Sequence, residues 1–215
     1  MNKTILTLAI ASLSLIACKK DGEKTDSQST VDSTATKTEE VATMIPDSAT
    51  ISKAWTEYAT PGDAHKRMAA DNGVWDEDMT SWQHEGGEPM KMKMTAEIKT
   101  IFDGKYQEAV HKGDFMGMPF EGKSTLAYDN ASKEYISTWI DNMSTGIMVM
   151  RGNYDDASKT FKMEGEVIDP VTKKMKKMRE VITIMDDNTQ KMEMYDTGYD
   201  GKEFKNMEII MKRKK

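Results

Sequence analysis

From residue 74 to the C-terminus, apolar and polar residues alternate along the chain, and short groups of turn residues interrupt the alternation. The clearest case is residues 90–101, where every second residue is apolar and most residues between them are charged. A period of two is that of a β-strand with one buried face and one solvated face. This segment therefore predicts a strand that directs Met90, Met92 and Met94 toward a core.

About ten segments of this kind are expected, each followed closely by a turn. The connections are too short to hold crossover helices, so the strands should pair antiparallel in an up-and-down meander. Closing such a sheet removes both exposed edges. The predicted fold class is mainly β, an antiparallel up-and-down β-barrel of calycin or lipocalin type. The expected strands are residues 75–82, 90–101, 106–112, 120–128, 134–140, 147–152, 161–168, 175–185, 190–196 and 203–212.

Residues 47–73, which precede the barrel domain of residues 74–215, are expected to be helical. Apolar residues recur at helical spacing over residues 47–58, after Asp47 and Ser48, either of which can cap the helix. A proline–glycine pair breaks this helix, and Asp63 is expected to cap a second one that ends near residue 70. One or two short helices should therefore lie ahead of the first strand.

The first residues indicate where the protein resides. Residues 4–17 are almost all apolar or small, too few to span a bilayer but of the length of a signal-peptide core. The core ends in LIAC, residues 15–18, which resembles the bacterial lipobox. The resemblance implies that residues 1–17 are removed and that acyl chains attach Cys18 to a membrane. Lys19 after the cysteine implies, by analogy with lipoprotein sorting, an outer-membrane lipoprotein of the cell envelope that faces the periplasm or the surface.

Residues 18–46 are rich in Ser, Thr, Asp, Glu and Lys, and the first aromatic residue after Cys18 is Trp55. Such a segment cannot bury enough apolar surface to offset the entropy of ordering it. We expect a disordered, acylated tether here. An ordinary signal peptide with a chance cysteine is the alternative interpretation.

Composition excludes several classes of function. Cys18 is the only cysteine, so its acylation leaves no thiol for catalysis, disulfides or zinc. A formal net charge of −6 argues against nucleic acid as a partner. No two of the three histidines have the spacing of zinc ligands, and no phosphate-binding glycine loop or nucleophile elbow occurs. We therefore expect no cofactor, no metal and no catalytic residue.

The alternating methionines have three interpretations. Thioethers bind Cu(I), but metal ligands must converge, whereas these rows run along strands far apart in sequence. Packing in the barrel core is the favoured interpretation. A flexible surface that contacts a ligand is another, because methionine adapts to irregular apolar shapes. Candidate lining residues are Met92, Met94, Trp139, Met148, Met192 and Met194.

Three stretches together are similar to one known family. They are PGDAH from residue 61, FMGMPFEG from residue 115 with YISTWID from residue 135, and DGKEF from residue 200. They resemble the bacterial family called domain of unknown function 1579, over about residues 60–215. The resemblance implies a secreted or lipid-anchored calycin-like barrel, and it implies no particular activity.

Other polar residues have a structural and a functional interpretation. His111 is expected to point outward into solvent, although an inward position would allow it to bind a ligand or metal. Trp139 is expected to be a core aromatic or a wall on which a ligand stacks. Asp141 is expected to cap the loop toward residues 144–145. The basic run at residues 173–179 is expected to be a solvated hairpin, or else a contact for anionic lipid headgroups.

The leading functional hypothesis is a lipid-anchored envelope protein that binds a small apolar molecule, because a ten-stranded barrel encloses more room than a few side chains fill. The first alternative is a structural or interaction lipoprotein with a packed barrel. The second is an enzyme, which would need polar groups such as His111, Tyr128 and Asp141 to converge inside the barrel.

Overall fold

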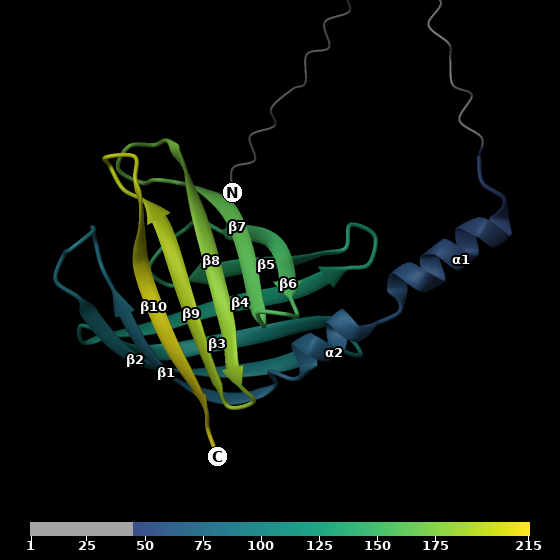
Figure 1. Ribbon diagram of the computed structural model, residues 1–215, viewed down its shortest axis with the longest axis horizontal. Coiled ribbons are helices and arrows are strands. Elements are labelled where there is room, and N and C mark those ends of the chain that lie inside the picture. Colours follow the sequence, from purple (N-terminus) through teal and green to yellow (C-terminus); the bar gives the residue numbers. More distant parts are fainter. Residues whose placement is uncertain (1–44) are drawn as a thin grey trace, which may run out of the picture. The chain divides into compact units, whose positions relative to one another are not determined.

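The computed structural model describes residues 45–215, which form two short helices followed by ten strands that close into a barrel (Figure 1). The predicted fold class is confirmed. Cys18, the signal peptide and residues 18–44 of the predicted tether lie outside the described residues. The elements are α1 (Ser48–Ala59), α2 (Asp63–Ala69), β1 (Gly73–Ser81), β2 (Met90–Ile101), β3 (Tyr106–Phe115), β4 (Met118–Asp129), β5 (Glu134–Asp141), β6 (Met148–Asp155), β7 (Thr160–Ile168), β8 (Met175–Asp186), β9 (Thr189–Thr197) and β10 (Glu203–Arg213).

Every strand pairs antiparallel with its neighbours in sequence, and β1 also pairs with β10, which closes the sheet. In Figure 1, strands β7 to β10 run across β2 to β5. β3 and β4 are longer than expected because only Met116 and Gly117 separate them. Both residues have positive φ, 54° and 85°, as the tight hairpin turns of this length require.

The first helix begins as expected, because the side chain of Asp47 accepts the Thr50 N–H at 2.8 Å. The second helix begins differently. Its N-cap is Gly62, not Asp63, and the Gly62 N–H donates to Nδ1 of His65 at 3.0 Å. The imidazole of His65 thus reaches back to the N-cap backbone N–H, and the N–H groups of His65 and Lys66 donate to the Gly62 carbonyl and not to a capping carboxylate.

The two ends of the barrel differ. Because successive strands are antiparallel, alternate connections lie at the same end. At the end that we call the helix end, α2 is held to the barrel by a hydrogen bond of 2.6 Å from Gln107 of β3 to the Met68 carbonyl. Its connections are residues 102–105, 130–133, 156–159 and 187–188. At the opposite end, the loop end, the connections are residues 82–89, 116–117, 142–147, 169–174 and 198–202.

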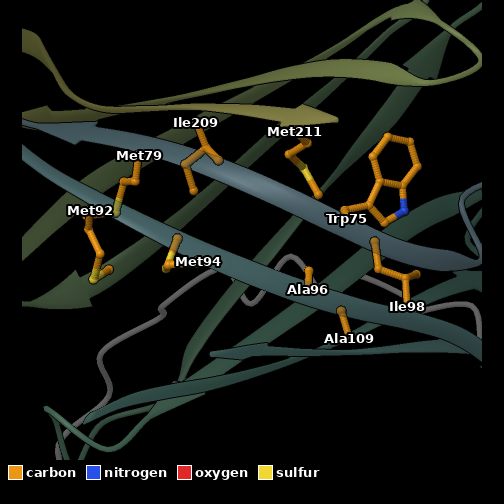
Figure 2. Packing of buried hydrophobic residues seen from close by; sticks show 9 residues of the cluster. All are labelled: Trp75, Met79, Met92, Met94, Ala96, Ile98, Ala109, Ile209 and Met211. Atoms are coloured by element: carbon orange, nitrogen blue, oxygen red, sulfur yellow. The ribbon is translucent and has the colours of Figure 1, made fainter. Parts of the chain in front are cut away.

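Two groups of buried side chains form the core of the barrel, and the first includes the alternating methionines of β2. Met92 and Met94 are only 7% and 6% exposed, as the packing interpretation predicts. Figure 2 shows these side chains spread along the strands, with Met79, Met92 and Met94 at one end of the group and Trp75 at the other. The first group is Trp75, Met79, Met92, Met94, Ala96, Ile98, Ala109, Ile209 and Met211. The second is Met68, Tyr135, Met150, Phe161, Met163, Met178, Ile184 and Met194.

Neither helix in residues 45–215 is long and apolar enough to cross a bilayer.

Candidate functional site

A buried acid and a histidine meet inside the barrel. Glu77 of β1 lies in register between Met94 and Met211, two buried residues of the core, and is itself only 2% exposed. Nδ1 of His111 on β3 lies 3.1 Å from each oxygen of the Glu77 carboxylate. The expectation that His111 points outward is therefore wrong. It pairs in register with Ala96, which is fully buried, and Glu77 provides the polar partner that makes an inward imidazole acceptable.

The imidazole of His111 is not fully enclosed. Its side chain keeps 13% of its surface accessible, whereas that of Glu77 keeps 1%. Among the described residues, only its Nδ1 atom has a hydrogen-bond partner. His111 therefore keeps one ring nitrogen, Nε2, without a partner among the described residues.

Trp139 of β5 forms the wall next to His111, with ring centroids 5.1 Å apart. Its indole N–H donates to Asp141 at 2.8 Å, which fixes the ring against the barrel wall. The ring lies over Gly122, where an added Cβ would come within 2.4 Å of a ring carbon. The other oxygen of Asp141 accepts the Met143 N–H at 2.9 Å, so Asp141 caps the loop at residue 143 and not at residues 144–145.

A second carboxyl group, Glu180 of β8, faces the same interior. It lies in register between Met163 and Met194, which are 1% and 6% exposed. Within residues 45–215 it has no hydrogen-bond or ion-pair partner. Burial in this apolar setting raises the pKa of Glu180 to about 7, and the opposing effect of His111 is smaller. Glu180 is therefore a carboxyl group poised to change its charge near neutral pH.

The sequence contains a signal for these two acids. Glu77 is in phase with Trp75 and Met79, and Glu180 is in phase with Met178 and Ile182. An ionisable side chain on the buried, apolar face of a strand must lose its charge, pair with a polar or oppositely charged group, or have a functional role. That criterion selects both glutamates from the sequence.

All six predicted lining residues face the barrel interior according to the strand register. Three are buried and belong to the packed groups, namely Met92, Met94 and Met194. The other three are half-buried, namely Trp139, Met148 and Met192. That any of them contacts a ligand remains a prediction.

The three residues that an enzyme would need, His111, Tyr128 and Asp141, do not all meet at one place in the barrel. Tyr128 is six residues from Gly122 along β4, so it lies about 20 Å from the level of His111, with which Gly122 pairs. Its ring instead contacts His65 and Tyr135 at the helix end, with centroids 5.8 and 4.9 Å apart. Tyr128 therefore cannot act together with Asp141 and His111. No cluster of three potential metal-ligating His, Cys, Asp or Glu side chains occurs among the described residues.

The basic run at residues 173–179 is only partly the solvated hairpin that was expected. Lys176 turns inward at the loop end, where its ammonium group lies 2.6 Å from Asp196 and 3.6 Å from Asp169. Arg179 pairs with Glu203 on the outside. These ion pairs leave fewer basic side chains available to lipid headgroups than the sequence suggested.

A polar cleft of about 270 Å³ lies at the helix end, between α2 and the turn of β8 and β9. Its side chains bind one another: Gln190 donates to Asp71 at 2.7 Å, and Arg67 lies 3.3 Å from the same oxygen. Burial raises the pKa of Asp71 despite these partners. The side chains that line this cleft therefore hold α2 against the barrel through their contacts with one another.

Comparison with known proteins adds a family and a fold. A family model described as "Protein of unknown function (DUF1579)" matches residues 60–213. Rv2717c from M. tuberculosis has a similar structure, with a TM-score of 0.53 and 9% identity over 73% of this chain and 100% of its own. The S-type phycobiliprotein lyase CPES from Guillardia theta is similar at a TM-score of 0.50 and 10% identity, over 75% of this chain and 97% of its own. At these identities the likeness shows the fold alone. No curated protein matches the chain.

Proposed function

The chain belongs to the family of unknown function DUF1579, and because that description names no activity, we propose from the barrel itself that the protein binds a small, mainly apolar molecule in its interior. One protein with a similar fold is named a phycobiliprotein lyase, which supports a small molecule as the partner of such a barrel.

One observation carries the proposal. Three inward-facing side chains keep accessible surface: His111 in the middle of β3, Trp139 near the end of β5, and Met148 at the start of β6. When a ligand covers apolar surface that is accessible inside a barrel, that surface is removed from water and the complex is stabilised. Methionine side chains suit this role because they adjust to the shape of the ligand.

Native mass spectrometry of the protein purified from its own cells tests the proposal. We expect the wild-type protein to carry an added small-molecule mass. Ser124 faces the interior beside Trp139, whereas Thr125 faces outward. Ser124→Phe should fill the space and abolish the added mass, whereas Thr125→Phe should leave it unchanged. A wild-type protein free of any ligand, with both variants behaving alike, would refute the proposal.

We also propose that the barrel is attached to the outer membrane by acyl chains on Cys18. The lipobox-like residues 15–18 and the polar segment that follows them support this proposal. Cells fed labelled palmitate should label the wild-type protein and leave Cys18→Ala unlabelled. A mature wild-type chain with a free Cys18 thiol would contradict it.

A second candidate function is an interaction lipoprotein whose barrel is packed. It is favoured by large apolar side chains that are exposed on four connections of the loop end. A photo-crosslinking residue at position 147, in one of these connections, should then capture an envelope component, and one at position 93 in mid-barrel should not. Crosslinks only to lipid or to the protein itself would count against this function. The exposed residues are Met116 (81%), Ile147 (62%), Val171 (72%) and Tyr199 (80%).

A further inference from the structure

The polar groups inside the barrel point to a specific class of ligand. We propose that the bound molecule carries a positively charged amine on an apolar body, and that Glu180 binds this amine. The inference rests on the proposed function, since it requires a ligand in the interior. It follows from the balance of charge and of hydrogen bonds on the inward faces of the strands.

The middle of the barrel interior has no spare positive charge. Among the described residues, the strands direct only two basic side chains inward, and both lie at the ends. At the loop end, Lys176 is paired with Asp196 and Asp169. At the helix end, Arg213 donates to the backbone carbonyls of Ala70 and Asn72 and lies over the Trp75 ring, 4.2 Å from its centre. Neither basic group is available to Glu180.

Among the described residues, the carboxyl groups of Glu77 and Glu180 and the imidazole of His111 lie between these ends, while Asp141, the last residue of β5, accepts from the Trp139 indole. Glu77 and His111 satisfy each other at 3.1 Å, so the pair needs no further charge. Glu180 has no hydrogen-bond or ion-pair partner in residues 45–215, and Met163 and Met194 flank it on the neighbouring strands. The inward residues beside it on β8 are Met178 and Ile182, which cannot bond to it either.

An unpaired carboxylate in an apolar setting is costly, and a ligand that brings its own positive charge removes that cost. The raised pKa of Glu180 reflects the cost of ionising this carboxyl group without a positively charged partner. An ammonium group would favour the ionised carboxylate and donate charge-assisted hydrogen bonds to it. A ligand carboxylate would instead meet the charges of both glutamates. The interior should therefore prefer an amine to an alcohol, and an alcohol to an acid, on the same apolar body.

Octylamine, octanol and octanoate test this order, because they differ only in the head group. Titration calorimetry is carried out on the full chain held in lipid nanodiscs, and the signal from empty nanodiscs is subtracted. At pH 8 we expect octylamine to bind about ten- to a hundredfold more tightly than octanol, and octanoate more weakly than either.

Two variants show whether Glu180 is responsible. Glu180→Gln keeps the shape and removes the charge, so it should bring the affinities for octylamine and octanol within about threefold. Glu166→Gln removes one negative charge from the exposed face of β7, and it should retain the preference of the wild-type protein. Circular dichroism establishes that both variants are folded.

The outcomes separate this inference from the proposed function. If all three probes bind equally to the wild-type protein, or if octanoate binds best, the interior accepts ligands but the amine specificity is wrong. An amine preference that persists in Glu180→Gln also overturns the role of Glu180. If no probe binds, both the inference and the proposed function fail.

Discussion

Glu180 should make the stability of the barrel depend on pH in a way that one substitution removes. In the unfolded chain this carboxyl group ionises near its ordinary value of 4.5, whereas in the folded barrel its pKa is about 7. Between these pH values the folded state holds a proton that the unfolded state has released. The free energy of unfolding must therefore fall as the pH rises through this window.

The magnitude follows from the two pKa values. A rise from 4.5 to about 7 corresponds to about 3 kcal/mol of lost stability once the pH exceeds the folded value. Glu180→Gln has no such group. An amide in the same apolar site adds its own cost, but that cost is the same at every pH. The difference in stability between variant and wild type should therefore shift in favour of the variant by about 2–3 kcal/mol between pH 5 and pH 8.

Urea denaturation at several pH values, followed by circular dichroism, measures this difference. Other titrating groups, including Asp71, are present in both proteins and cancel in the comparison. Glu166→Gln is the control, because Glu166 is exposed and its removal should produce no pH-dependent difference. A constant difference between Glu180→Gln and wild type from pH 5 to pH 8 would refute the reasoning. It would mean that Glu180 has a partner or is solvated in the folded protein.

Three further predictions concern contacts around the site and at the helix end of the barrel. Gly122→Ala should lower the free energy of unfolding by about 1–3 kcal/mol and change the fluorescence of Trp139, because the new Cβ displaces the ring; an unchanged emission spectrum would contradict the close approach. His111→Leu should destabilise the barrel by about 3 kcal/mol in urea denaturation, because it leaves Glu77 buried and unpaired, and adding Glu77→Leu should restore most of that loss. Strictly additive losses would show that the two residues do not form a pair. Arg213→Lys should speed hydrogen exchange at the end of α2, because a single ammonium nitrogen cannot reach all three carbonyls to which separate guanidinium nitrogens donate. Protection equal to wild type would show that Arg213 does not hold this segment.

The alternation of residues was sufficient to predict most of the fold. Residues 90–101 were expected as a strand, and β2 has those bounds. The antiparallel meander followed from the short connections, and closure followed from the cost of exposed edges. These features are local, because each strand carries its own period and each turn its own residues. The two short helices ahead of the barrel lie where they were expected, although the N-terminus of α2 depends on His65, a side chain within the helix itself.

The interior site was harder to predict, and His111 shows why. Its phase with Ala109 places it on the inner face, but a histidine there is acceptable only with a partner, and that partner is Glu77 on another strand. The sequence around residue 111 does not indicate that residue 77 is its partner. Tyr128 illustrates the reverse error, since its chemistry suited a catalytic group while its position along β4 placed it at the other end of the barrel.

The chain alone was enough to establish strands, turns and a closed antiparallel sheet, because a two-residue period and short connections are properties of neighbouring residues. Which side chains meet across the barrel depends on how ten registers combine when the sheet closes. That closure brought Glu77 to His111 and placed Glu180 between methionines, with no partner in the part of the chain that the structure describes. Burial and charge pairing are properties of the assembled interior, so the chemistry of this barrel emerges only when the strands are in place.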